Sequence, residues 1–207
     1  MEIPHQNCAV ICMEMQRGTI GDCSPIPALC EAARENSIVE RTAKVLRSAR
    51  QNAVPVVHCT AEFRADRRGS SITAPILAQM ATIPGHIECG SAAASIMPDL
   101  GPEPDDFVIS RLHGVSPFSG TALDITLRNL DVQTVILAGV SVNLGVLGLA
   151  IEAVNLGYGV IILDDAVAGV PQQYVADVKR HTLSHIATLY RCDEVILRWE
   201  HCSNDSS

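Results

Sequence analysis

Aromatic residues are scarce in this sequence, and positive charge is in the minority. Phe, Trp and Tyr make up 3% of the 207 residues, whereas hydrophobic residues as a whole make up 47%. A core must therefore be built from aliphatic side chains, and there is enough apolar material to exclude a disordered chain. The 15 Lys and Arg residues face 23 Asp and Glu residues, which gives a net charge of −8. This balance argues against nucleic acid or an anionic membrane as a partner, because both require a basic face.

Long hydrophobic runs are also absent. No apolar run approaches the roughly 18 residues that a membrane-spanning helix needs. The segment from Met1 to Asn7 is polar and lacks the apolar core of a signal peptide. We therefore expect a cytoplasmic protein. The length predicts one domain over residues 1–207, with a core over about 8–198 and a polar tail over 201–207.

Metal and nucleotide motifs are missing as well. The eight cysteines form no CxxC pair and no Cys/His pattern with the spacing of a zinc site. We interpret them as small buried hydrophobic side chains in a reducing compartment. The sequence has no P-loop and no GxGxxG, so a nucleotide cofactor is not expected. Neither a cofactor nor a metal is predicted.

Short apolar runs alternate with helix-like segments along the chain. Most of these runs are continuously apolar, which is typical of strands buried on both faces. The alternation predicts an α/β fold with three α/β/α layers, in which helices cover both faces of a six-stranded, mainly parallel sheet. The six runs are Cys8–Met13, Val54–Cys59, Phe107–Ile109, Val135–Ala138, Val160–Leu163 and Val195–Leu197.

Three segments have apolar residues at helical spacing: Ile38–Ala49, Leu123–Leu130 and Val175–Leu189. The segment Val142–Leu156 is nearly all apolar and predicts a buried helix. The segment from Arg64 to Pro104 is rich in Gly, Pro, Ser and Ala. It predicts loops and short helices over one edge of the sheet.

Ligands of open parallel sheets bind at the carboxyl ends of the strands, and four ionisable residues stand there. Glu14 ends the first run and can serve as a general acid or base, or as a structural acid paired with an Arg. Arg111 can clamp a substrate carboxylate or neutralise Glu14. His58 and His113 can shuttle a proton, although a lone histidine is more often structural.

Two glycines, Gly145 and Gly148, lie in the first turns of the helix that follows the fourth run. The N-terminus of such a helix offers free N–H groups to an anion. Glycine there costs about 1 kcal/mol relative to alanine. Close backbone packing or space for a ligand would explain it.

Five segments follow one another in an order that carries a family resemblance: Val10–Gln16, Phe107–Arg111, Ser116–Leu123, Leu137–Tyr158 and Val160–Ala168. They resemble the isochorismatase-like hydrolase superfamily, whose first strand ends in Asp-Met-Gln, whose strand at the second segment ends in Lys, and whose third segment reads Phe-x-Gly-Thr-x-Leu. The resemblance runs from Ala9 to about Val195. No single motif is decisive, but their order together is a strong signal for the fold.

The family's catalytic trio is Asp, Lys and Cys, and the cysteine attacks an amide or related carbon. The matching positions here are Glu14, Arg111 and Gly145, so all three differ. No cysteine is near Gly145 in sequence. The resemblance therefore implies that the cysteine amidase mechanism does not operate. The nicotinamidase metal motif, an Asp and two His after the second strand, is also absent from residues 58–71.

True isochorismatases likewise have Gly in place of the Cys and cleave a vinyl ether with an aspartic acid as proton donor. The resemblance thus implies Glu14 as the acid and Arg111 beside a substrate carboxylate. Arg64, with Arg67 and Arg68, can reach a second carboxylate or can simply be solvated. One objection is physical: a guanidinium favours the ionised form of a nearby carboxyl group, whereas an acid must carry a proton.

The resemblance also implies a retained pocket. The turn Gly139–Ser141 matches one with a non-proline cis peptide between Val140 and Ser141, and Phe118 matches an aromatic residue of the pocket wall. The predicted substrate-binding residues are Gln16, His58, Arg64, His113, Phe118, Val140, Ser141, Asn143 and Leu144.

Three functional hypotheses follow. The first is a cysteine-independent hydrolase of a small carboxylated molecule, with Glu14 central. The second is a binding or structural relative in which Glu14 and Arg111 form an inert ion pair. The third keeps amidase chemistry with Ser141, or with a water activated by Glu14 or His113. Gly145 together with a carboxylate at Glu14 favours the first, and the Lys-to-Arg change favours the second. A homo-oligomer is expected, and residues 64–104 are expected to set specificity.

Overall fold

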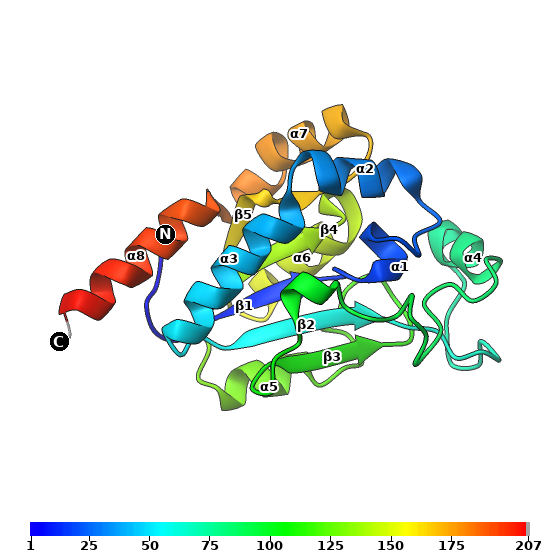
Figure 1. Ribbon diagram of the computed structural model, residues 1–207, viewed down its shortest axis with the longest axis horizontal. Coiled ribbons are helices and arrows are strands. Elements are labelled where there is room, and N and C mark those ends of the chain that lie inside the picture. The colour runs from blue at the N-terminus through cyan, green and yellow to red at the C-terminus, as the bar shows by residue number, and fades with distance from the viewer. Residues whose placement is uncertain (206–207) are drawn as a thin grey trace.

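A six-stranded parallel sheet forms the centre of the computed structural model, which describes the backbone of residues 1–205 and the side chains of residues 1–201 (Figure 1). The strand order is β3-β2-β1-β4-β5-β6, and every neighbouring pair is parallel. The predicted α/β fold is confirmed. The strands are β1 (Cys8–Met13), β2 (Val56–Ala61), β3 (Phe107–Arg111), β4 (Thr134–Val140), β5 (Gly159–Ala168) and β6 (Thr188–Tyr190).

Helices cover both faces of this sheet. One hydrophobic cluster joins it to α2, α3 and α8, and a second joins it to α5, α6 and α7. Side chains of β1 alternate between the clusters: Val10 and Cys12 lie in the first, and Ile11 and Met13 in the second. Figure 1 shows α3 in front of the sheet and α6 behind it. The helices are α1 (Arg17–Ile20), α2 (Pro27–Glu35), α3 (Ile38–Gln51), α4 (Pro75–Ala81), α5 (Leu123–Asn129), α6 (Leu147–Asn155), α7 (Gln172–His181) and α8 (Cys192–Asp205).

The order of the strands reverses between β1 and β4, because β2 and β3 lie on one side of β1 and the later strands on the other. Crevices at such a switch point are where open α/β sheets bind ligands. Gly139 allows the two strands to approach closely here. Its φ is +112°, and a Cβ at this position would lie 2.1 Å from the carbonyl oxygen of Met13.

One of the six predicted strands was wrong. The run Val195–Leu197 lies in α8, and the sixth strand is Thr188–Tyr190. This strand overlaps the end of the segment Val175–Leu189, for which the sequence predicts a helix. Cys192, Val195 and Trp199 are buried. Their spacing of three and four residues is that of one face of a helix, so a short apolar run concealed a helical pattern.

The segment Val142–Leu156, for which the sequence predicts one buried helix, also differs from the prediction. It begins as a π-helical turn over Val142–Val146 and continues as α6. Its inner face is buried, but Ile151 and Val154 are exposed. The prediction of a buried helix therefore holds for the inner face and is wrong for the outer one. The segment Val175–Leu189 divides similarly, because α7 ends at His181.

The irregular segment of residues 64–104 contains α4 and a 3₁₀ turn over Pro98–Leu100. Figure 1 shows α4 beyond the carboxyl ends of β1 and β2, close to α1. The predicted tail is helical as far as Asp205, and residues 206 and 207 lie outside the described part. The single domain over 1–207 stays a prediction. No helix among the described residues is long and apolar enough to cross a membrane.

Candidate active site

A cavity of about 130 Å³ opens at the carboxyl ends of β1 to β4. Its walls come from the turns after these strands, from α1 and α2, and from α4 and the loop that follows it. Most of the wall is apolar. Six of the predicted site residues line it together: Glu14, Arg111, His113, Ser141, Leu144 and Gly145.

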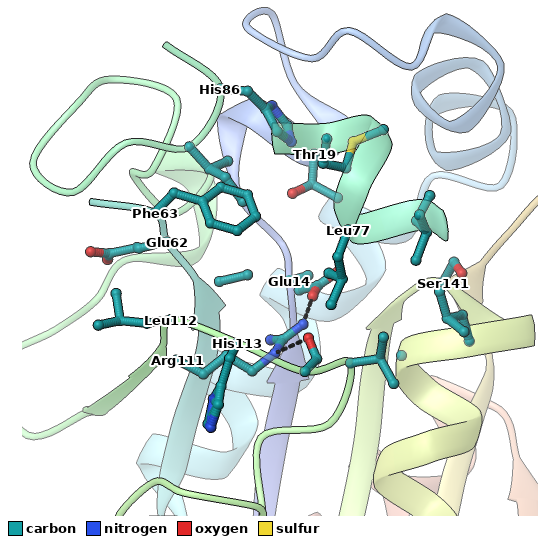
Figure 2. Close-up of a pocket in the computed structure, with 18 of the residues that line it drawn as sticks. Glu14, Thr19, Glu62, Phe63, Leu77, His86, Arg111, Leu112, His113 and Ser141 are labelled. Carbon is teal, nitrogen blue, oxygen red and sulfur yellow. Dashed lines mark hydrogen bonds and ion pairs between the residues drawn. The ribbon is translucent and has the colours of Figure 1, made fainter. Parts of the chain in front are cut away.

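Glu14 and Arg111 form an ion pair at the floor of this pocket (Figure 2). Nη2 of Arg111 donates to Oε1 of Glu14, and its Nε donates to the carbonyl oxygen of Gly114 at 3.3 Å. The arginine side chain is 4% exposed and the glutamate side chain 20%. Such a buried cation requires a counter-charge, which Glu14 supplies.

The guanidinium of Arg111 is not fully used. Its Nη1 is buried and has no hydrogen-bond partner among the described residues. An unpaired buried donor costs free energy. One guanidinium nitrogen of Arg111 is thus left over after Glu14 and the carbonyl oxygen of Gly114 are bonded.

The backbone at Glu14 has an uncommon conformation. Its φ is +50°, in the left-handed region that non-glycine residues seldom occupy. Its N–H donates to the carbonyl oxygen of Cys59 at 2.9 Å, which ties the end of β1 to β2. Strained residues of this kind cluster at functional sites.

Gly145 lies at the pocket without room for a side chain. A Cβ there would be 2.9 Å from Cε of Met13 and 3.1 Å from the carbonyl oxygen of Val140. Met13 thus fills the space that a residue at position 145 would need. Nothing in the sequence distinguishes Met13 from its apolar neighbours, and sequence reasoning missed it.

No described cysteine lines the pocket. Cys59 is a buried thiol near Glu14 and Arg111, and burial raises its pKa to about 12. A thiol attacks as its thiolate, so Cys59 is not a nucleophile at neutral pH.

The peptide bond between Val140 and Ser141 is cis, as the family resemblance implies. Val140 is buried below the pocket, and Ser141 makes no side-chain hydrogen bond among the described residues. Asn143 does not line the pocket, and its Oδ1 is buried without a partner in the described part of the chain. Leu144 is exposed at the pocket wall.

Two predicted binding residues hold the backbone together instead. The side-chain amide of Gln16 donates to the carbonyl oxygens of Ala61 at 3.0 Å and Ala94 at 2.8 Å, and its Oε1 accepts from the N–H of Ala61 at 2.8 Å. Phe118 is buried and stacks on Tyr158 with ring centroids 5.8 Å apart. Neither residue lines the pocket.

Two further predicted residues point elsewhere. His58 is buried on the face of the sheet that carries α3, with Nε2 3.2 Å from Oδ2 of Asp106. Burial lowers its pKa, an effect that the hydrogen bond to Asp106 opposes. Arg64 is exposed and bonded to Asp66 at 2.8 Å. Neither side chain is part of the pocket wall.

Two histidines do line the pocket, and their rings lie toward its opposite ends in Figure 2. The ring of His113 packs on Gly120, where a Cβ would lie 2.7 Å from its Cε1. His86 was not singled out from the sequence. It lies in the irregular segment, where no periodicity or motif marks individual residues, and only the three-dimensional structure brings it to the site.

Residues 8–190 match the isochorismatase domain family. The chain belongs to this family. YecD of Escherichia coli O157:H7, an uncharacterized isochorismatase family protein, is 25% identical over 205 residues, covering 95% of this chain and 98% of YecD. YwoC of Bacillus subtilis (strain 168), also an uncharacterized isochorismatase family protein, is 35% identical over 75 residues. That match spans only 36% of this chain and 39% of YwoC.

The fold also matches a cysteine hydrolase from Pseudomonas syringae pv. phaseolicola 1448A. The TM-score is 0.80 at 28% identity, covering 97% of this chain and 96% of that protein. The isochorismatase family member described here has no cysteine on its pocket wall among the described residues. It also has no group of three or more His, Cys, Asp or Glu residues in the described part that could hold a metal.

Proposed function

We propose that this isochorismatase-family protein hydrolyses a small carboxylated molecule without a cysteine nucleophile. The observation that carries the proposal is the Glu14–Arg111 pair at the floor of a pocket that no described thiol lines. Arg111 binds the substrate carboxylate, and Glu14 transfers the proton. The bond that breaks is a vinyl ether, which needs a proton donor rather than a nucleophilic side chain.

Substrate binding itself supplies the proton donor. A carboxylate held by Nη1 of Arg111 places a second negative charge beside Glu14. The negative charges of two neighbouring carboxylates repel each other, and this repulsion disfavours the state in which both are ionised. In the proposed complex, Glu14 is the group that lies beside the bound substrate and passes the proton to it.

The reaction then follows from the position of Glu14. Its proton passes to the terminal vinyl carbon, and the adjacent carbon becomes an oxocarbenium ion. A water molecule adds to that carbon and returns one proton to Glu14. The resulting hemiketal breaks into a ketone and an alcohol. General acid catalysis of this kind contributes about 10²- to 10⁴-fold in rate.

The pocket also limits the size of the substrate. Its volume of about 130 Å³ is close to that of a cavity of roughly 150 Å³ that holds benzene in another protein. The walls beside the ion pair are apolar and include Phe63, Ile76 and Leu77. The substrate is therefore a compact carboxylate with an apolar body.

The test uses 2-methoxyacrylate, a vinyl ether that carries a carboxylate and that yields pyruvate and methanol. We expect the protein to accelerate pyruvate release, and Glu14→Gln to slow it at least about 100-fold. Glu35→Gln, an exposed carboxylate on α2, is the matched control and should retain full activity. No acceleration by the wild type, or full activity of Glu14→Gln, would contradict the proposal.

The direct ion pair favours one alternative, a binding protein without turnover. Such a protein would bind 2-methoxyacrylate, lose affinity on Arg111→Lys, and release no pyruvate. Arg47→Lys, an exposed position on α3, is the control. The amidase alternative through Ser141 has less support, because no base among the described residues is hydrogen-bonded to that hydroxyl.

A further inference from the structure

His86 is fixed at the end of the pocket away from Arg111 (Figure 2). The loop that carries it is clamped to Phe63 by two backbone hydrogen bonds, from the N–H of Phe63 to Ile87 at 2.9 Å and from the N–H of Cys89 to Phe63 at 2.8 Å. The N–H of His86 itself donates to the carbonyl oxygen of Ile83 at 3.3 Å. These hydrogen bonds fix the backbone that carries His86 before any ligand arrives.

The imidazole of His86 has no hydrogen-bond partner among the described side chains and backbone groups. The residue is only 6% exposed, and its Nδ1 is buried with no partner in the part of the chain that the structure describes. Nearly all buried polar groups in proteins are hydrogen-bonded, and the exceptions call for an explanation. A ligand atom that completes this hydrogen bond explains it.

The charge state of the His86 ring determines which ligand group can bind to it. Burial lowers the pKa of His86, the charge of Arg67 lowers it further, and Glu14 opposes both. The ring is therefore neutral near pH 7 and offers one donor and one acceptor. A hydroxyl group matches either nitrogen, because it can donate and accept.

A positive group beside His86 is disfavoured. Arg67 lies over the ring of Phe63, with its guanidinium carbon 4.7 Å from the ring centre. Its Nη2 donates to the carbonyl oxygen of Ile83 at 3.3 Å, the same carbonyl that accepts from the N–H of His86. Glu88 balances part of this charge, because its Oε1 lies 3.8 Å from the same Nη2. The positive charge that remains disfavours an ammonium group relative to a neutral hydroxyl.

We infer that His86 is a specificity-determining residue that binds a substrate hydroxyl group at the end remote from the carboxylate. The placement of the carboxylate on Arg111 rests on the function proposed above. Apolar side chains such as Phe63 and Leu77 line the wall. The substrate class is thus a small hydroxycarboxylate whose two polar ends are joined by an apolar body.

Two probe pairs test this inference, and in each pair a hydroxyl replaces a methyl group. They are 4-hydroxybutyrate with pentanoate, and trans-4-hydroxycyclohexanecarboxylate with trans-4-methylcyclohexanecarboxylate. Affinities are measured by calorimetry on the full chain at pH 7.5. In at least one pair we expect the hydroxyl member to bind at least about fivefold more tightly to the wild type.

Variants then assign the preference to His86. His86→Phe should abolish it and bind the methyl member within about twofold of the wild type, whereas His86→Gln, which keeps polar atoms there, should retain part of it. His185→Phe, an exposed histidine elsewhere, should leave it unchanged. Arg111→Lys should weaken both members of a pair by similar factors.

The two proposals fail differently. If the carboxylates bind the wild type but neither pair shows a hydroxyl preference, the role of His86 is wrong and the carboxylate site stands. If the wild type prefers the hydroxyl member and His86→Phe keeps that preference, the role of His86 is also wrong and the carboxylate site stands. If no carboxylate binds the wild type, both proposals are overturned.

Discussion

At the residue scale, the buried guanidinium of Arg111 determines the character of the site. Among the described residues it has one counter-ion, Glu14, and one of its amino groups has no hydrogen-bond partner. The two partners of the pair are not equivalent, because Arg111 is almost fully enclosed while part of Glu14 reaches the solvent. Loss of Glu14 and loss of Arg111 should therefore lower the free energy of unfolding by different amounts.

We expect Glu14→Gln to destabilise the protein more than Arg111→Gln does. Loss of the carboxylate leaves a buried, uncompensated cation, which costs about 3 kcal/mol. Loss of the guanidinium leaves a carboxylate that water can reach, and this costs less. Urea unfolding at pH 7.5 measures both. The reverse order would mean that Arg111 turns to solvent when Glu14 is lost.

Gly145 gives a second prediction at this scale. Gly145→Ala should lower the free energy of unfolding by about 1–3 kcal/mol, because its Cβ meets Met13 and the carbonyl of Val140. Gly148→Ala is the control in the next helical turn. Its Cβ would meet Ser116 at an ordinary 3.6 Å, so the substitution should stabilise α6 by about 0.5–1 kcal/mol. Equal effects would contradict the packing described for Met13.

At the element scale, the sequence pattern predicted five strands at the correct places. Four of them, β1, β2, β4 and β5, are buried from both sides and read as continuous apolar runs. The fifth, β3, lies at the edge of the sheet and is only partly buried. The sixth failed because β6 is only half-buried and three residues long, so it carries no clear run. The segment Val195–Leu197 forms an apolar run by chance. Ile196 and Leu197 lie beside the buried face of α8 and not on it.

The two sides of α8 should respond differently to truncation. Val195→Ala should cost about 2 kcal/mol, because Val195 is buried against the sheet. Leu197→Ala should change the stability by less than about 0.5 kcal/mol, because Leu197 is 53% exposed. Fluorescence of the single tryptophan, Trp199 on the same helix, reports unfolding of both variants. Similar costs would mean that Leu197 is covered in solution, for instance by a second copy of the chain.

At the scale of the whole molecule, the site combines parts that a sequence can reveal with parts that it cannot. Glu14 and Arg111 stand at strand ends and Gly145 lies in the helical turn that follows β4, so the order of the strands places them together. The sequence does not identify His86 and Met13 as part of the site. His86 lies in an irregular loop, and Met13 is one of several apolar residues in β1. His58 shows the converse: it lies within β2, and its side chain points to the face that carries α3.

Buried histidines make the stability of the molecule depend on pH. The pKa values of His58 and His86 are lowered in the folded state, in both cases first by burial. The folded protein then binds protons less readily than the unfolded chain does. The free energy of unfolding should be unaffected above their usual pKa of 6.5 and should fall as the pH is lowered through it.

Urea unfolding at pH 7.5, 6.0 and 5.0 checks this dependence. His86→Gln should reduce the slope between pH 6.5 and 5, whereas His185→Gln, an exposed histidine, should not. A stability that rises as the pH falls through this range would mean that the two buried rings are charged in the folded protein.

The central claim is that Glu14 protonates a carbon atom of the substrate in a pocket that no described thiol lines. The most direct measurement is proton NMR of the products that the wild-type protein forms from 2-methoxyacrylate in D₂O. The account predicts pyruvate with one deuterium in its methyl group, formed by the wild type and at least about 100-fold more slowly by Glu14→Gln. Binding of the compound without release of pyruvate would contradict it and would leave the pocket as a binding site.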